Sequence, residues 1–101
     1  MRLYDLATVI RSKNAGPFTL TIDVMFDSDA VLRRVTRAAG LQPATIAALY
    51  GVPVTDVRVH VFEQVRTIKV SMPRRVGSGA AADTDVYGSQ QHFPLGNVEV
   101  P

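Results

Sequence analysis

A polar segment near the start of the chain carries groups that bind anions. Its residues are, in order, Arg11, Ser12, Lys13, Asn14, Ala15 and Gly16. Guanidinium and ammonium groups attract carboxylate or phosphate oxygens, and a glycine lets backbone N–H groups approach an anion closely. The spacing does not match the G-x-x-x-x-G-K-[ST] pattern of a P-loop. The anion-binding candidates are Arg11, Ser12, Lys13, Asn14 and Gly16, and the alternative interpretation of the segment is a solvated hairpin turn.

A second polar segment, residues 83–92, gathers carboxylates, a phenol, amides and an imidazole without a hydrophobic period. Two carboxylates at Asp-x-Asp spacing can hold a hard cation, and a histidine can act as an acid or a base. The segment is not an EF-hand, because a tyrosine stands where that loop needs Asp or Asn. The candidates are Asp83, Asp85 and His92 for catalysis, and Tyr87, Gln90 and Gln91 for lining a pocket. Alternatively, the two carboxylates cap a turn or pair with arginine, and we expect no metal site.

The composition excludes several classes of protein. The chain has 101 residues, of which 47% are hydrophobic and 20% are charged, so we expect one folded domain over residues 1–101. The absence of cysteine excludes disulfides, thiolate nucleophiles and Cys-ligated metals. The longest uncharged stretch, residues 38–55, is interrupted by glycine and proline and is too short to span a bilayer. The first residues do not resemble a signal peptide. We therefore expect a cytoplasmic protein without membrane contact.

The charges are distributed unevenly along the chain. Residues 1–75 hold all 11 basic side chains and six acidic ones, a net charge of +5, whereas residues 76–101 hold three acids and no base, a net charge of −3. The pattern predicts a basic body and an acidic, irregular tail that folds back on the body or docks on a neighbour. A weak nucleic-acid interaction is the disfavoured alternative, because the basic residues are scattered and no recognition motif accompanies them. The residues that would carry it are Arg33, Arg34, Arg37, Arg74 and Arg75.

Hydrophobic periodicity predicts the elements that position these residues. Apolar residues alternate with polar ones from Phe18 to Phe26, which is the pattern of a half-buried strand. Residues 3–10 fit either a strand or a short helix, and we favour a strand. Further strands are expected over residues 57–62 and 67–72, with an edge strand over 97–100. Helices are expected from residues 27–29 to Gly40 and from Pro43 to Gly51, and loops over 11–17 and after Pro73. This order predicts an α+β fold in which two helices cover one face of an antiparallel sheet.

The segments 3–7, 10–18 and 83–92 together resemble a family of small proteins of unknown function that accompany AtuA-type proteins of acyclic terpene utilisation. The similarity covers essentially the whole chain. A fainter similarity links it to the ferredoxin-like C-terminal domain of some AtuA proteins, although Lys13-Asn14 replaces a Gly-Asp pair of that domain and no lysine follows Gln91. The resemblance implies a ferredoxin-like sandwich and a role beside a larger, AtuA-like protein in a homo- or hetero-oligomer.

Three functions follow as hypotheses. The first is a small accessory subunit of an AtuA-like protein that is not catalytic alone. The second is a subunit that contributes an anion-binding and acid–base site to a shared active site for a small carboxylate or an acyl-CoA. The third is a weak nucleic-acid binder. We expect no cofactor in any of them.

Overall fold

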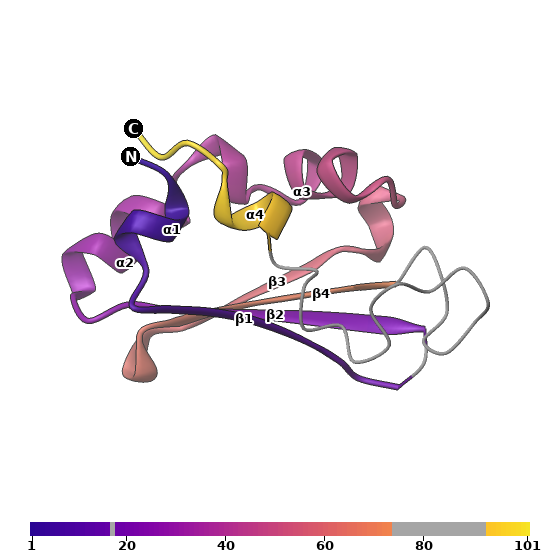
Figure 1. Cartoon of the computed structure of the whole chain (residues 1–101), viewed down its shortest axis with the longest axis horizontal. Coiled ribbons are helices and arrows are strands. Elements are labelled where there is room, and N and C mark those ends of the chain that lie inside the picture. Colours follow the sequence, from indigo (N-terminus) through magenta and orange to yellow (C-terminus); the bar gives the residue numbers. More distant parts are fainter. Residues whose placement is uncertain (17, 74–92) are drawn as a thin grey trace.

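The computed structural model describes residues 1–16, 18–73 and 93–101. Four strands, β1 (Val9–Asn14), β2 (Thr19–Met25), β3 (Arg58–Phe62) and β4 (Thr67–Pro73), form one antiparallel sheet in the order β1-β2-β4-β3. The helices lie together on one face of this sheet (Figure 1). They are α1 (Leu3–Leu6), α2 (Asp29–Thr36), α3 (Pro43–Tyr50) and α4 (Phe93–Gly96), with short 3-10 turns at Ala39–Leu41, Val54–Asp56 and Glu63–Val65. The predicted α+β fold is confirmed.

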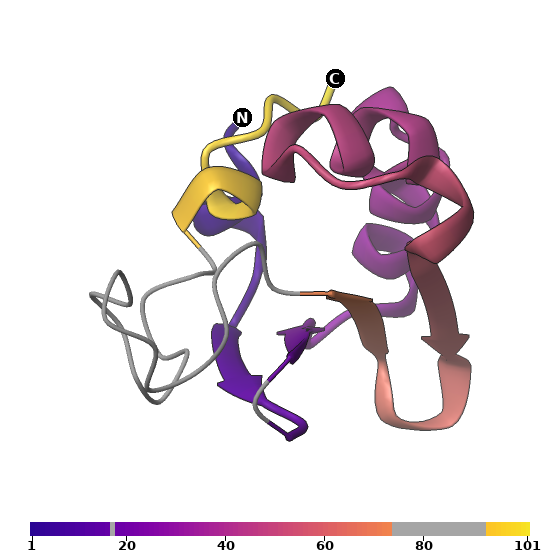
Figure 2. The same cartoon turned by 90° about the vertical axis from the view of Figure 1, so that its right-hand side faces the viewer.

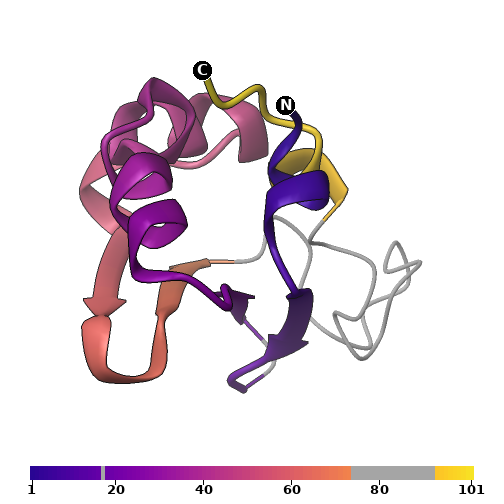
Figure 3. The same cartoon turned by 90° about the vertical axis from the view of Figure 1, so that its left-hand side faces the viewer.

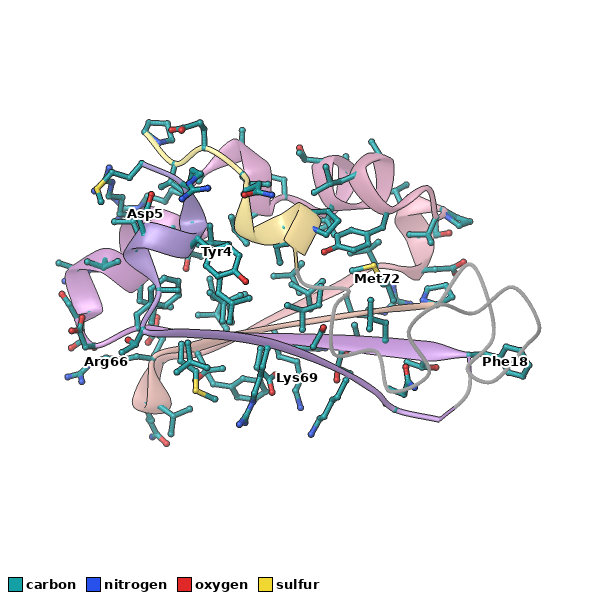
Figure 4. All side chains as sticks on the ribbon, in the orientation of Figure 1. Tyr4, Asp5, Phe18, Arg66, Lys69 and Met72 are labelled. Carbon is teal, nitrogen blue, oxygen red and sulfur yellow. The ribbon has the colours of Figure 1, made fainter. Side chains whose placement is uncertain are left out.

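The central strand β2 is the one that the sequence predicts most clearly. Leu20, Ile22 and Val24 point toward the helices and are buried, as their alternation requires. They meet the buried Ile68, Val70 and Met72 of β4 in register. Phe18, which was expected on the same face, precedes the strand and is exposed at the end of the sheet (Figure 4).

The two longer helices begin where their capping residues predict. The Ser28 hydroxyl accepts a hydrogen bond from the Val31 N–H (3.5 Å) at the start of α2. Pro43 stands at the first turn of α3, and Gly51 ends that helix with a φ of +67°, a left-handed conformation that suits glycine. Buried side chains of both helices pack on the sheet and form one core with it.

The N-terminal strand and the loop after it were predicted incorrectly. Residues 3–6 form α1, because Leu3, Leu6 and Ala7 have helical spacing and face the core. The strand starts later, at Val9, and continues through the expected loop to Asn14. Backbone pairing with β2 keeps residues 11–14 in a strand, although their side chains alone suggest a turn.

The end of α2 also differs from the prediction. The helix ends at Thr36 rather than at Gly40, and Gly40 is buried in the 3-10 turn that follows. A Cβ atom at this position would collide with Val98. The glycine is therefore required by close packing of the C-terminal segment and does not act as the helix stop.

The expected edge strand over 97–100 is reduced to an isolated bridge between Arg2 and Glu99 that follows α4. The Leu3 N–H donates to the Val98 carbonyl and the Val100 N–H donates to the Met1 carbonyl, each at 2.8 Å. The two ends of the chain thus lie side by side above the sheet (Figures 2 and 3). This pairing lies outside the sheet, so the segment forms no fifth strand of it.

The ferredoxin-like arrangement is not confirmed. That fold runs β-α-β-β-α-β, whereas α2 and α3 both lie between β2 and β3 in this chain. The described strands form two hairpins that are joined by a helical block, and β2 of the first hairpin pairs with β4 of the second. Within the described residues, no helix is both long and apolar enough to cross a bilayer.

Candidate functional site

The sheet has one face that no described helix covers, and we call it the open face (Figure 1). Its residues alternate with the buried core residues, and Lys69 points away from the helices on this side (Figure 4). The strand register arranges its side chains in three rows that cross the sheet. They are Val9, Met25, Thr67 and Phe62; Arg11, Asp23, Lys69 and His60; and Lys13, Thr21, Ser71 and Arg58.

The middle row centres on a buried carboxylate. Asp23 is only 6% exposed, and its Oδ2 lies 3.6 Å from the Nε of Arg11 on β1. On its other side the register places Lys69 of β4. The Oδ1 atom is buried and has no hydrogen-bond partner among the described residues. A buried acceptor without a partner costs about 1–3 kcal/mol, and this cost opposes the gain from the ion pair with Arg11.

The third row adds positive charge with little to neutralise it. Lys13 is exposed, and Arg58 donates to the Thr55 carbonyl (2.5 Å) at the edge of the sheet. Together with Arg11 and Lys69, these give the open face four cationic side chains against one carboxylate, Asp23, among the described residues of its three rows. Charges of one sign gathered on one surface attract a partner of the opposite sign.

The first row forms an apolar end beside the turn between β3 and β4. Phe62 is 48% exposed and its ring lies 6.3 Å from that of His60. Val65 in the turn is also exposed, and Val9 is exposed at the opposite end of this row, on the edge strand β1. An open depression of about 480 Å³ is lined by Val61, Phe62, Glu63, Gln64 and Val65. An aromatic side chain at the margin of an apolar patch is a common anchor in protein–protein interfaces.

The structure separates the anion-binding candidates of the first polar segment. Arg11 and Lys13 lie on the open face, whereas Ser12 and Asn14 lie on the side of the sheet that faces the helices, because side chains alternate along β1. Gly16 lies in the hairpin turn with a φ of +88°. The segment therefore presents two cations to the open face and does not fold as one cradle.

The candidates of the second polar segment lie outside the described residues. These are Asp83, Asp85, His92, Tyr87, Gln90 and Gln91, and the same holds for Arg74 and Arg75. For these residues, the expected contact of the acidic tail with the basic body or with a neighbour stays a prediction. In the described ranges, no group of three or more His, Cys, Asp or Glu side chains could hold a metal ion.

Sequence reasoning missed Asp23 and Lys69 as site residues. One signal was present, since an aspartate in the middle of a strongly alternating strand is unfavourable for strand formation. The sequence alone does not show which strands lie beside Asp23. Only the register places Arg11 and Lys69 on either side of this carboxylate.

Comparison with known proteins identifies a family but no activity. No curated protein matches the chain, and no solved structure does. A family described as a domain of unknown function, DUF4387, matches residues 3–99, which is nearly the whole chain. The chain therefore belongs to the DUF4387 family.

Proposed function

We propose that this chain is a small accessory subunit, not catalytic alone, that docks through its open face on an acidic surface of a larger, AtuA-like protein. The observation that carries the proposal is the character of the open face, which has four cations, one buried carboxylate and an apolar end, and no described helix over it. The AtuA-like identity of the partner rests on the resemblance of the polar segments.

The charges of the open face favour an acidic partner. Arg11, Lys13 and Lys69 are within reach of a surface laid against the sheet, and opposite charges there would accelerate association and set its register. The exposed Phe62 would supply apolar contact area at one end of the interface. Charge complementarity and an aromatic anchor together describe a specific, reversible interface.

The same charges disfavour self-association through this face. Two copies that met face to face would bring lysines and arginines against one another, and like charges across an interface are destabilising. We therefore assign the face to a different, acidic protein. A homo-oligomer that uses the open face would contradict this assignment.

The test is co-expression with the AtuA-like protein, followed by size exclusion and a binding titration at micromolar concentration. We expect one co-eluting complex whose dissociation constant rises with salt. Lys69→Glu should raise that constant about tenfold or more, because it places a like charge against the acidic partner. Arg37→Glu is the matched control, since it makes the same charge change at the C-terminal end of α2, in the helical layer, and should change the constant less than about twofold.

Two results would overturn the proposal. Separate elution of this chain and the AtuA-like protein at micromolar concentration would show that the two proteins do not form the proposed complex. A complex that is weakened by Arg37→Glu and unaffected by Lys69→Glu would place the interface on the helices.

A further inference from the structure

A groove on the outer side of the helical layer is bordered by three arginines. It measures about 410 Å³ and is lined by Ala30, Arg33, Arg34, Arg37, Ala38 and Pro101. The helical residues recur at spacings of three and four, so they share one face of α2 and its C-terminal extension. The small side chains of Ala30 and Ala38 leave the space into which the longer arginine side chains can reach.

One of the arginines is held in place by the C-terminal segment. The Nε of Arg34 donates to the Pro101 carbonyl at 2.6 Å, which fixes the guanidinium at the border of the groove. Its remaining N–H groups stay available, because a guanidinium has five donors. The groove is therefore partly preorganised for an acceptor.

The arginines have no carboxylate partner in the described part of the chain. None of the ion pairs found there includes Arg33, Arg34 or Arg37. The acid at the start of α2, Asp29, is bound by the Nε of Arg66 at 2.8 Å, and this hydrogen bond lowers the pKa of Asp29. Arg33 also borders a neighbouring pocket that contains Asp29 and Glu63, and Arg34 donates to the main-chain oxygen of Pro101, so Arg37 is the cation of the groove for which neither contact is found in the described residues.

Stabilisation of the helix dipole explains only part of this arrangement. Cations in the last turn of α2 interact favourably with its C-terminal end, which accounts for a basic residue there. Three neighbouring cations also repel one another, and the repulsion is greatest between residues four apart, such as Arg33 and Arg37. A bound anion would remove that repulsion.

We infer that this groove binds the phosphate group of a small molecule. Guanidinium groups form paired, charge-assisted hydrogen bonds with phosphate oxygens, and two or three of them match the double charge of a phosphate better than the single charge of a carboxylate. The site lies in the helical layer, whereas the open face lies on the other side of the sheet. The inference is thus independent of the proposed docking function.

The test is a titration of the full chain with inorganic pyrophosphate at low salt, followed by calorimetry and by backbone amide shifts. We expect saturable binding with shifts confined to α2 and the C-terminal segment. The double variant Arg34→Ala/Arg37→Ala should weaken binding about tenfold or more, and alanine preserves the helix. The matched control is Lys13→Ala/Lys69→Ala, which removes the same charge from the open face and should leave binding within about twofold.

A parallel titration with a short single-stranded oligonucleotide distinguishes a small phosphate ligand from nucleic acid. Pyrophosphate binding that depends on Arg34 and Arg37, with no tighter binding of the oligonucleotide, supports the inference. Three outcomes overturn it: no saturable pyrophosphate binding, equal weakening by both double variants, or oligonucleotide binding that far exceeds pyrophosphate binding.

Discussion

Asp23 contributes a carboxylate to the open face at a position where a buried charge is unfavourable for a strand. It lies in the middle of β2, is almost fully buried, and leaves Oδ1 without a partner among the described residues. Thr21, the next residue on the same face of β2, is buried to a similar extent without a carboxylate. Residues that cost stability in this way are frequently kept for function.

Replacing Asp23 with threonine should therefore stabilise the isolated chain. Threonine favours strands and carries no buried charge, so Asp23→Thr should raise the free energy of unfolding by about 1 kcal/mol. Arg11 would lose its partner at little cost, because its side chain is largely exposed. Urea denaturation of both proteins measures the difference.

The control for this variant is Ser71→Thr, which raises strand propensity on the same face without removing a carboxylate, and which should change the stability by less than about 0.5 kcal/mol. If Asp23→Thr destabilised the chain by 1 kcal/mol or more, Asp23 would be a stabilising residue and our interpretation of it would be wrong.

At the scale of elements, the C-terminal helix is attached to the helical layer by a tyrosine. The Leu95 N–H of α4 donates to the Tyr50 hydroxyl of α3 at 3.2 Å. Burial raises the pKa of Tyr50 to about 12 from its ordinary value of 10.0, and the hydrogen bond from Leu95 only partly opposes this rise. Gly96 of the same helix packs so closely on Tyr4 that a Cβ atom would collide with the ring. Two aromatic side chains thus position α4.

The raised pKa predicts an alkaline loss of stability. The unfolded chain releases the Tyr50 proton near pH 10 and the folded chain near pH 12, so ionisation favours unfolding between these values. The stabilisation is complete below pH 10 and should fall by roughly 2 kcal/mol as the pH rises to 12. Tyr50→Phe should lose about 1–3 kcal/mol at pH 7, since it leaves the Leu95 N–H without this acceptor.

The free energies of unfolding of the unchanged chain and of Tyr50→Phe should be measured at several pH values between 7 and 12. Other titrating groups affect both proteins alike, so the difference between the two free energies reports on Tyr50. A difference that stayed constant from pH 9 to 12 would contradict the assigned cause.

The sequence predicted those elements whose local signals agree with the packing. β2, α2 and α3 begin close to the expected positions because alternation, a serine cap and an N-terminal proline act locally. The strand at 9–14 was predicted as a loop, since its assignment depends on pairing with β2, and of the two alternatives at residues 3–6 the helix is the one that forms. For the same reason, Arg11 and Lys13 were identified while their separation from Ser12 and Asn14 was not.

At the level of the whole molecule, two different kinds of surface lie on opposite sides. The helices, the C-terminal segment and the arginine-lined groove occupy one side, and the open face with its cations and Phe62 occupies the other (Figures 1 and 4). A protein built in this way can dock by its sheet while its helical layer stays in solvent. The proposed partner should therefore cover the open face and leave the helices exposed.

Hydroxyl-radical footprinting of the chain, alone and in complex with the proposed AtuA-like partner, shows which side is covered. Phe62 on the open face and Leu49 on α3 are matched probes, because they are 48% and 43% exposed, respectively. We expect the oxidation of Phe62 to fall severalfold in the complex and that of Leu49 to stay unchanged. Protection of Leu49 with unchanged oxidation of Phe62 would contradict this expectation.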